Sequence, residues 1–446
     1  MSTFTDLGVP ARLAAVLTAQ NIHHPTPIQL ATLPDALAGR DVLGRGRTGS
    51  GKTLAFLLPV VARLRGGARS RGGAPRALIL APTRELAGQI DAVLVPLAAA
   101  AGLTSRTVFG GVGQNPQVSA IRRGVDIVVA CPGRLEDLIA QGHCSLDAVE
   151  ITVLDEADHM ADLGFLPAVR RLLAATPAGG QRMLFSATLD RAVDGLVRTF
   201  LSDPAVHEAD SGASPVATMD HHVLHVARAD RLPVMLDLIR APGRSVVFTR
   251  TKRGAATLAQ LLAGHGVKAV QLHGNLGQSV RTRNLAAFHA GKAAVLVATD
   301  IAARGIHVDD VRLVIHADPP ADHKAYLHRS GRTARAGNSG CVITIVTTDQ
   351  MREVDALTRA AGIKPTTTKV SSLNHPLLAV LAPGERALRE PVRDPAPDLA
   401  ERVDRAAEPR RATRPRSRSL VGVAPSGSGA TFSAPMHSAA AFSARR

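Results

Sequence analysis

Short apolar runs alternate with helical patterns from residue 40 to about residue 208. The apolar runs are Val42–Leu43, Ala77–Leu80, Ile127–Val129, Ile151–Leu154 and Met183–Phe185. Such alternation is typical of a parallel β-sheet covered by helices. The pattern therefore predicts an α/β domain over residues 1–208.

The same pattern restarts after a stretch rich in Ser, Gly, Ala and Pro, and we interpret residues 209–221 as a linker. Helical patterns at 231–240, 251–263 and 279–290 lie between new strand candidates, which are Val223–Val226, Ser245–Phe248, Val270–Leu272, Val295–Ala298, Val311–Ile315 and Val342–Val346. We predict a second α/β domain over residues 222–370. Two similar units in series indicate a cleft between them.

Two stretches differ in composition from these domains. Beyond residue 370 the periodicity fades, Pro, Ala, Ser and Arg dominate, and arginines gather at Arg410, Arg411, Arg414, Arg416 and Arg418. Such a segment cannot bury enough apolar surface to offset its ordering entropy, so residues 371–446 are expected to form a disordered basic tail. Residues 65–73 carry two Arg-Gly-Gly triplets in an expected loop, where contact with nucleic acid and a merely flexible insertion are both open.

Length and composition narrow the class of protein. A chain of 446 residues is too long for one core, which serves roughly 250 to 300 residues. No apolar stretch is long enough to cross a bilayer and no secretory signal is visible, so a cytoplasmic location is expected. The three cysteines fit neither a disulfide framework nor a metal site, and we expect all to be reduced: Cys131, Cys144 and Cys341.

The formal net charge of +16 predicts attraction to polyanions, of which nucleic acid is the commonest. A coding bias toward Arg and Ala would produce the same charge without any ligand, so both explanations stay open. The chain has no Trp and one Tyr, and it therefore lacks aromatic platforms on which bases stack. Any contact with nucleic acid is expected to be made mainly to the backbone.

A glycine-rich motif follows the first apolar run and precedes a helical pattern over residues 54–64. It fits G-x-x-x-x-G-K-[ST] with Gly46, Arg47, Thr48, Gly49, Ser50, Gly51, Lys52 and Thr53. Glycines let backbone amides surround phosphate oxygens, and a helix N-terminus adds positive potential. Lys52 is expected to reach the β- and γ-phosphates, and Thr53 to hold Mg²⁺. The alternative, a glycine-rich turn with an accidental lysine, leaves the flanking strand and helix unexplained.

Paired carboxylates follow the apolar run Ile151–Leu154, whose end is expected at the same edge as the phosphate motif. We assign Asp155 to Mg²⁺ through its water shell, and Glu156 to the deprotonation of the attacking water. An acidic helix N-cap would explain Asp158 nearly as well. It would not explain two carboxylates paired with a phosphate-binding lysine.

The sequence Asp-Glu-Ala-Asp at 155–158 resembles the signature of the DEAD-box RNA helicases, and further motifs of that family follow over about residues 4–366. Phe4 and Pro25–Gln29 resemble the motif in which the glutamine, here Gln29, contacts adenine. The resemblance implies two tandem RecA-like domains, ATP as cofactor, and RNA contacts at Pro82, Thr83, Arg84, Gly111, Pro132, Gly133 and Arg134. Ser186 and Thr188 resemble the motif that couples hydrolysis to strand separation.

The second half of the chain resembles the same family. The resemblance implies a nucleotide contact at Asp300 and RNA contacts at Arg250, Arg281, Thr299, Arg304 and Gly305. The segment His328–Arg335 matches H-R-x-G-R-x-x-R, whose arginines stabilise charge on the γ-phosphoryl group. In the family Arg332 and Arg335 would take this catalytic part, with Arg335 as the finger, a contribution of about 10³ to 10⁵ in rate in related NTPases.

Three positions depart from the family pattern. Ile22 stands where an aromatic residue usually packs on adenine, which implies weaker adenine binding. Gly46-Arg47 replaces Ala-Gln, a change that keeps the loop because glycine is permissive. His307 replaces an aspartate, and its cation would disfavour a nearby arginine, so activity is expected to fall when acid protonates this histidine.

These features together predict an RNA-dependent ATPase, acting as a monomer, that unwinds short RNA duplexes or remodels RNA–protein complexes. ATP and RNA would each favour closure of the two domains on the RNA backbone. The basic tail is a candidate site for ribonucleoprotein partners. Two alternatives stay open: an ATP-dependent RNA clamp or assembly factor with negligible turnover, and a DNA-directed helicase.

Overall fold

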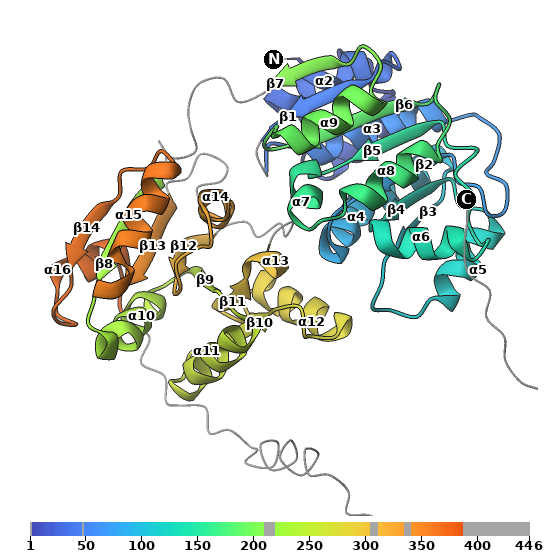
Figure 1. Ribbon diagram of the computed structural model, residues 1–446. Coiled ribbons are helices and arrows are strands. Elements are labelled where there is room, and N and C mark those ends of the chain that lie inside the picture. Colours follow the sequence, from blue (N-terminus) through green and yellow to red (C-terminus); the bar gives the residue numbers. More distant parts are fainter. Residues whose placement is uncertain (1, 47–48, 209–218, 304–310, 334–339, 387–446) are drawn as a thin grey trace, which may run out of the picture. The chain divides into compact units, whose positions relative to one another are not determined.

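The computed structural model describes residues 2–46, 49–208, 219–303, 311–333 and 340–386, which form two α/β domains (Figure 1). In the first domain, seven parallel strands form one sheet in the order β3-β4-β2-β5-β6-β1-β7. The strands are β1 (Val42–Arg45), β2 (Ala77–Leu80), β3 (Ser105–Val108), β4 (Ile127–Ala130), β5 (Ile151–Leu154), β6 (Gln181–Ser186) and β7 (Ala205–Glu208). The helices are α1 (Ala11–Ala19), α2 (Pro27–Leu37), α3 (Lys52–Leu64), α4 (Arg84–Ala101), α5 (Asn115–Arg123), α6 (Pro132–Ala140), α7 (Ala157–Asp162), α8 (Leu166–Ala174) and α9 (Arg191–Phe200).

Helices cover both faces of this sheet, because successive side chains of a strand point to opposite faces. Met183 and Phe185 of β6 face a core that includes α1, α2, α3 and α4. Leu184, between them, faces a second core that includes α5, α6, α7, α8 and α9. A strand buried on both faces is apolar at consecutive positions. This double burial explains why the central strands appear in the sequence as continuous apolar runs.

The second domain repeats the arrangement, with a parallel sheet in the order β10-β11-β9-β12-β13-β8-β14. Its strands are β8 (Met219–His225), β9 (Arg244–Thr249), β10 (Ala269–Leu272), β11 (Val295–Thr299), β12 (Val311–His316), β13 (Gly340–Val346) and β14 (Thr366–Lys369). Its helices are α10 (Arg231–Arg240), α11 (Lys252–Gly264), α12 (Gln278–His289), α13 (Asp300–Ala303), α14 (His323–Ser330), α15 (Met351–Ala360) and α16 (Pro376–Leu381), with 3-10 turns at Arg228–Asp230 and Thr348–Gln350. The predicted fold class, two tandem α/β domains with parallel sheets, is confirmed.

The sequence pattern did not predict three of the strands, and all three lie at sheet edges: β3, β7 and β14. Their sequences, Ser-Arg-Thr-Val, Ala-Val-His-Glu and Thr-Thr-Thr-Lys, are largely polar. An edge strand has one neighbour and faces solvent, so it does not need the apolar run that marks a central strand. The search for apolar runs therefore found the centres of both sheets and missed three of their edges.

The second domain extends beyond residue 370, where the sequence analysis expected a disordered tail to begin. Leu378 and Leu381 of α16 are buried in the core beside α10. Arg386 Nη2 then binds Asp237 Oδ2 at 2.9 Å. The expectation of disorder is wrong for residues 371–386. It arose because a six-residue helix is too short to show a helical period in the sequence. Residues 387–446 lie outside the described residues, as do residues 209–218 of the expected linker, while β8 begins at Met219.

Two further expectations concern the helices and the cysteines. No helix within the described ranges is long and apolar enough to cross a membrane. Cys131, Cys144 and Cys341 carry free thiols, as expected. Burial raises the pKa of the Cys131 thiol to about 12, so it is not a reactive thiolate at neutral pH.

Candidate functional site

Apart from Gln29, which lies on α2, the predicted site residues of the first domain lie at the carboxyl ends of its strands or follow them. The phosphate motif follows β1, the paired carboxylates follow β5, and the first coupling residue ends β6, which lies between β1 and β5. The predicted RNA contacts follow β2, β3 and β4. Ligand sites of parallel α/β sheets lie at this edge. The fold thus gathers the predicted residues of this domain at one edge of the sheet.

The phosphate loop joins β1 to α3 and requires glycine at its end. Gly51 is the N-cap of α3, with a φ of 96° in the left-handed region that favours glycine. A Cβ atom there would lie 2.5 Å from Thr26 Oγ1 and 2.6 Å from Gln29 Nε2. Gly49 also has a positive φ, of 88°. These two glycines are therefore needed both for the turn and for the close packing of α2 on the loop.

Lys52 begins α3 and is buried under the loop. Its Nζ donates a hydrogen bond to the Gly46 carbonyl at 2.5 Å, while Ser50 and Thr53 are half-buried. The first amides of a helix lack intrahelical partners, and the helix N-terminus carries partial positive charge. The loop, the lysine and the helix end together form an anion site of the kind that holds phosphates.

Gln29 connects α2 to this loop. Its Oε1 accepts a hydrogen bond from the Thr26 backbone N at 2.9 Å, and its Nε2 donates to the Gly51 carbonyl at 2.8 Å. Each end of an amide can form one more hydrogen bond, so the edge of a base can be contacted while the loop stays anchored. Phe4 and Ile22, the other residues of the expected adenine region, pack on the apolar core.

Asp155 and Glu156 are buried carboxylates on a strained turn between β5 and α7. Asp155 is 3% exposed, and its Oδ1 accepts a hydrogen bond from the Glu156 backbone N at 3.0 Å. Glu156 has a φ of 51° and a ψ of 54°, a left-handed conformation that is uncommon outside glycine. Backbone strain of this kind concentrates at functional sites, where the surrounding structure holds it.

The two carboxyl groups have different proton affinities. Burial and the neighbouring Glu156 charge raise the pKa of Asp155 to about 7, against the opposing charge of Lys52. Burial also acts to raise the pKa of Glu156, but the hydrogen bond and charge of His159 outweigh it and lower that pKa to about 2. Glu156 is therefore anionic at neutral pH, and Asp155 is the carboxylate that a cation would stabilise most.

A hydrogen-bond network ties these carboxylates to the end of β6. Asp158 Oδ2 accepts hydrogen bonds from both the backbone N and the Oγ1 of Thr188, each at 2.9 Å. Ser186 Oγ donates to the Thr188 carbonyl at 2.7 Å. His159 Nδ1 lies 3.1 Å from Glu156 Oε2, and because Glu156 is an anion this nitrogen is the donor. The predicted coupling residues are thus bonded to the segment that carries the predicted base.

The sequence analysis missed His159. It is 2% exposed, and its Nε2 has no hydrogen-bond partner among the described residues. Its spacing of three from Glu156 brings the two side chains together on α7, and this spacing was the available signal. Asp158, for which a helix N-cap was the alternative interpretation, instead bridges α7 to Thr188.

The predicted RNA residues of the first domain lie at neighbouring strand ends. Thr83 is the N-cap of α4, and Arg84 follows it. A Cβ atom at Gly111 would lie 1.9 Å from Arg84 Nη1, so only glycine lets this arginine take its position. Arg134 Nη1 donates to the Val112 carbonyl at 3.5 Å. Beside them, at the ends of β2 and β4, lie Pro82, Pro132 and Gly133.

In the second domain a buried arginine pairs with Asp300. Arg329 of α14 is 1% exposed, and its Nε and Nη2 donate to the two Asp300 carboxylate oxygens at 2.5 and 2.8 Å. Its guanidinium carbon lies 5.2 Å from the centre of the Phe248 ring. Asp300, expected to contact the nucleotide, is thus held by a bidentate pair inside its own domain. The predicted catalytic Arg332 is buried after α14, with its Nε donating to the His328 carbonyl at 3.3 Å.

The other predicted residues of the second domain follow β9, β10 and β11. Arg250 Nη2 donates to Glu353 Oε1 at 2.7 Å. Arg281 Nη1 donates to the His273 carbonyl at 3.1 Å, and Thr299 ends β11. Several predicted positions lie outside the described residues: Arg47, Thr48, Arg304, Gly305, His307 and Arg335.

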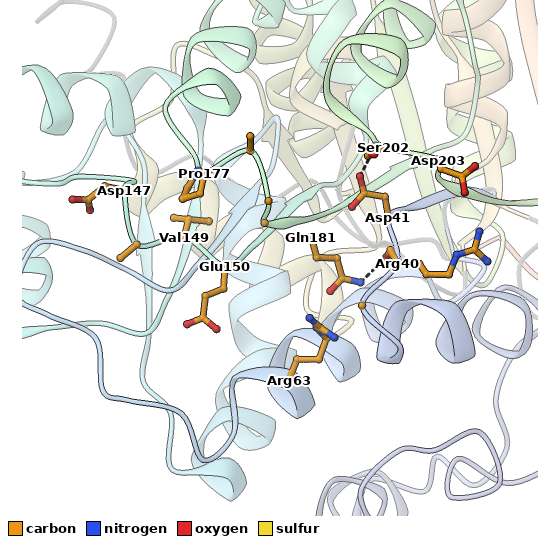
Figure 2. Close-up of a pocket in the computed structure, with 15 residues that line it drawn as sticks. Arg40, Asp41, Arg63, Asp147, Val149, Glu150, Pro177, Gln181, Ser202 and Asp203 are labelled. Carbon is orange, nitrogen blue, oxygen red and sulfur yellow. Dashed lines mark hydrogen bonds between the residues drawn. The ribbon is translucent and has the colours of Figure 1, made fainter.

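A cavity of about 770 Å³ lies at the opposite, amino edge of the first sheet (Figure 2). Loops that precede β1, β5 and β6 line it. Figure 2 shows its acidic side chains in two groups, Asp147 with Glu150 and Asp41 with Asp203. Because it lies at the other end of the strands from the phosphate loop, this cavity is not part of the nucleotide site.

Comparison with known protein families and relatives gives one consistent assignment. The family model described as DEAD/DEAH box helicase matches residues 26–196, and the helicase conserved C-terminal domain matches residues 228–337. The ATP-dependent RNA helicase RhlB of Pasteurella multocida is 39% identical over 359 residues, which cover 79% of this chain and 85% of that protein. The chloroplastic DEAD-box ATP-dependent RNA helicase 3A of Zea mays is 41% identical over 367 residues, 80% of this chain. The chain spans about half the length of this maize relative, 49%.

Solved structures have the same fold. S. cerevisiae Dbp5 bound to RNA and ADP BeF3 is 27% identical, with a TM-score of 0.74 over 85% of this chain and 99% of that one. The fold is also that of the DEAD-box helicase Mss116 bound to ssRNA and UDP-BeF, which is 24% identical over 86% of this chain and 84% of that one, with a TM-score of 0.74. By these matches and by its site residues, the chain belongs to the DEAD-box ATP-dependent RNA helicase family.

Proposed function

We propose that the protein is an RNA-dependent ATPase that unwinds short RNA duplexes or remodels RNA–protein complexes. The observation that carries the proposal is the network on α7. Glu156, the candidate base, lies two residues from Asp158, whose carboxylate holds the backbone and side chain of Thr188. Hydrolysis and the coupling segment are therefore linked through one short helix. The relatives named above are called RNA helicases, and the similar Dbp5 structure holds RNA with a nucleotide analogue.

The first domain has the groups that ATP with Mg²⁺ requires. The phosphate loop and Lys52 suit the phosphates, and Gln29 is placed to contact adenine. Asp155 and Thr53 supply the hard oxygen atoms that Mg²⁺ prefers. This sparse set fits Mg²⁺, which keeps several waters and binds phosphate oxygens. When bound, the metal would neutralise charge on the phosphates.

Glu156 is proposed as the general base of hydrolysis. It is an anion in a buried position, so it can accept a proton from an attacking water. His159 holds one of its carboxylate oxygens and fixes the direction of the other. Lys52 stabilises negative charge on the β- and γ-phosphates, and Arg332, with Arg335, would stabilise charge that develops during transfer.

RNA is proposed to bind across the carboxyl ends of β2, β3 and β4 through its backbone. The motifs placed there are the ones whose resemblance to the family implies contacts to the RNA backbone, and such contacts position RNA without reading its bases. A weak sequence preference follows. Preference for RNA over DNA would come from contacts to the 2′-hydroxyl groups. Action as a monomer and recruitment of ribonucleoprotein partners by the basic tail remain parts of this proposal.

The second candidate is an RNA clamp that binds ATP but hydrolyses it negligibly. In the sequence, this candidate is supported by Ile22 and His307, two positions that depart from the family pattern. Ile22 packs on the core rather than disrupting the loop, Lys52 is buried, and the Glu156 side chain is 12% exposed and paired with His159. Both side chains are the types that ATP hydrolysis requires, a cation for the phosphates and an anionic base for water, so these residues favour turnover.

Unwinding of a short RNA duplex tests the proposal. We expect the protein with ATP to separate a duplex of about ten base pairs that has a single-stranded extension. With a non-hydrolysable analogue, repeated rounds of strand separation should not occur. A DNA duplex of the same sequence is the matched control, and it should separate much more slowly. Tight ATP-dependent binding without separation or phosphate release would support the clamp, and equal rates on RNA and DNA would support the DNA-directed helicase.

A further inference from the structure

Five exposed arginines gather at the amino edge of the first sheet, far from the predicted RNA residues. Three lie on the loop that joins α3 to β2, and two form the last turn of α5, just before β4. We call them the arginine surface: Arg65, Arg69, Arg71, Arg122 and Arg123. The loop is the segment with two Arg-Gly-Gly triplets, for which the sequence left a nucleic-acid contact and a flexible insertion open.

The loop is fixed against its surroundings. The Ser70 backbone N donates to Asp126 Oδ1 at 3.1 Å, and the Gly73 backbone N donates to the Ile121 carbonyl at 2.9 Å. The Ser145 backbone N donates to the Gly73 carbonyl at 2.8 Å. These bonds pin residues 70–73 beside the end of α5, so Arg69 and Arg71 lie next to the arginines of that helix. A merely flexible insertion would not need them.

Packing explains the glycines of this loop but not its arginines. A Cβ atom at Gly72 would lie 2.5 Å from the Arg122 carbonyl, and one at Gly67 would lie 2.3 Å from Arg76 Nη2. Gly66 and Gly73 have φ of 76° and 82°. The glycines are therefore required by the fold. The arginines between them point to solvent and fill no space in the core.

The charge of this surface is largely unbalanced. Arg71 approaches Asp147 at 3.6 Å, whereas Arg65 and Arg69 form no ion pair with any residue the structure describes. Asp126, nearby, is buried and uses both carboxylate oxygens for hydrogen bonds to Ser70 and Thr104. Arginines at helix C-termini offset the helix dipole, which accounts for part of the α5 pair. It does not account for Arg69, which follows no helix.

The adjacent cavity does not share this character. Four acidic side chains line it along with Arg40 and Arg63, so its charges are mixed (Figure 2). The Asp41 carboxylate already accepts backbone hydrogen bonds from Arg182 and Ser202, each at 2.7 Å. A polyanion is therefore directed to the arginine surface and not into the cavity.

We propose that the arginine surface binds the phosphate backbone of RNA that extends beyond the segment held at the carboxyl edge. This inference rests on the proposed function. The two edges are separated by the length of the strands, on the order of 13 Å for four residues, so the nucleotides that fill the carboxyl edge do not reach the arginine surface, and RNA contacts it only where it extends beyond that site. The arginine surface contains no Phe, Tyr or Trp, so it has no aromatic ring on which a base could stack. The contact is electrostatic and independent of sequence.

The test compares two variants of the full chain that lose the same charge. The first is Arg65→Gln/Arg69→Gln/Arg122→Gln/Arg123→Gln. The control replaces four exposed arginines on α1, α8, α9 and α15: Arg12→Gln/Arg171→Gln/Arg198→Gln/Arg359→Gln. Affinity is measured by fluorescence anisotropy, over a range of salt concentrations, for a 10-nucleotide strand and for a 40-nucleotide hairpin with a single-stranded extension. RNA-stimulated ATP hydrolysis at saturating RNA is measured alongside.

We expect the first variant to bind the long RNA about 10-fold more weakly at 100 mM salt, with a salt slope smaller by about 3, as loss of four phosphate contacts predicts. Its affinity for the short strand and its saturated hydrolysis rate should equal those of the control. Long-RNA affinity and salt slope that match the control would overturn the proposal. The proposal would also be overturned if the first variant lost binding to anionic phospholipid vesicles while its RNA binding stayed unchanged. That result would assign the surface to a membrane. If the wild-type chain shows no RNA-stimulated hydrolysis, the proposed function fails instead.

Discussion

The two domains share one sheet order but differ in the loop that follows the same strand. β1 in the first sheet and β8 in the second each stand next to the last strand of the order. After β1 comes the glycine-rich loop that ends at Lys52, whereas after β8 come residues 226–230, which contain no glycine. Without glycine the backbone amides cannot turn inward around a phosphate. The fold offers the same position twice, and the loop makes only the first one a nucleotide site.

The buried polar groups differ in the same way. The first domain buries two acidic carboxylates after β5, and one of them is strained. After the corresponding strand β12, the second domain has Ala317 and Asp318, and Asp318 serves structure: its Oδ2 accepts from the Arg250 backbone N at 2.9 Å. The second domain also buries two histidines, His221 and His316, around Tyr326. The strained carboxylate turn is therefore a feature of the first domain, and the corresponding position of the second domain has a structural role.

The largest expected effect distinguishes the first residue of α3, Lys52, from the first residue of α10, Arg231. Lys52→Ala should lower RNA-stimulated ATP hydrolysis by about 10²- to 10³-fold, because one preorganised charge on the phosphates is lost. Arg231→Ala, at the corresponding start of α10, should leave hydrolysis within about twofold and cost about 1 kcal/mol of stability, because Arg231 donates to the Ala317 carbonyl. Steady-state phosphate release and urea unfolding measure both. Equal losses of hydrolysis in the two variants would contradict the difference between the domains.

The next effect concerns the buried histidines of the second domain. Burial lowers the pKa of His221 from 6.5 to about 4 and that of His316 well below 6.5. As the pH falls, these histidines are therefore protonated in the unfolded chain before they are protonated in the folded one. Their contribution to the free energy of unfolding is complete above pH 6.5 and is lost as the pH drops toward 4, by up to about 3 kcal/mol for His221 alone.

The only tyrosine, Tyr326, packs against both rings, so tyrosine fluorescence during urea unfolding reports this domain alone. The urea concentration at the unfolding midpoint should decrease when the pH is lowered from 7 to 5. The decrease should be smaller in His221→Phe. A midpoint that does not change over this range would show that the histidines are not buried in neutral form.

A smaller effect is expected where α7 meets the end of β6. Asp158→Ala removes the acceptor for the Thr188 N and Oγ1, so hydrolysis and strand separation should become uncoupled. We expect duplex unwinding to fall about 30-fold while ATP hydrolysis falls about 3-fold, a difference of about 1.4 kcal/mol. Unwinding and phosphate release are measured in the same reaction. Parallel losses of both activities would argue that Asp158 serves catalysis or folding and not coupling.

The smallest effect is predicted for His159. His159→Leu should lower kcat about 10-fold and leave the KM for ATP unchanged, because Glu156 keeps its place but loses the donor that orients it. His159→Asn, which offers a shorter N–H donor, should recover part of the loss. Steady-state kinetics at saturating RNA measure both constants. A rise in KM with unchanged kcat would show that His159 serves ATP binding instead.

The sequence was sufficient to predict the parts of this protein whose structure is determined by residues close together in the chain. Glycine at Gly51, a lysine at a helix start and carboxylates after a buried strand each follow from neighbouring residues, so the phosphate loop and Asp155–Glu156 could be found without a structure. Central strands were predicted for the same reason, because burial on both faces leaves a continuous apolar run.

The rest depends on contacts between distant segments. Asp158 meets Thr188 across 30 positions, and Asp300 meets Arg329 across 29. No spacing rule identifies such pairs. Likewise α16 is apolar, but its six residues are too few to show a helical period, and Leu378 and Leu381 complete the core beside α10. His159 was missed because its contact with Glu156 depends on the turn of one helix and on the strained backbone of Glu156.

The most direct test is steady-state ATP hydrolysis by the wild-type chain and by Glu156→Gln, with single-stranded RNA, with DNA of the same sequence and with no nucleic acid. The account predicts strong stimulation of the wild type by RNA alone, and a loss of about 10²- to 10⁴-fold in the variant, as removal of a general base implies. Hydrolysis that RNA does not stimulate, or that survives in Glu156→Gln, would contradict it.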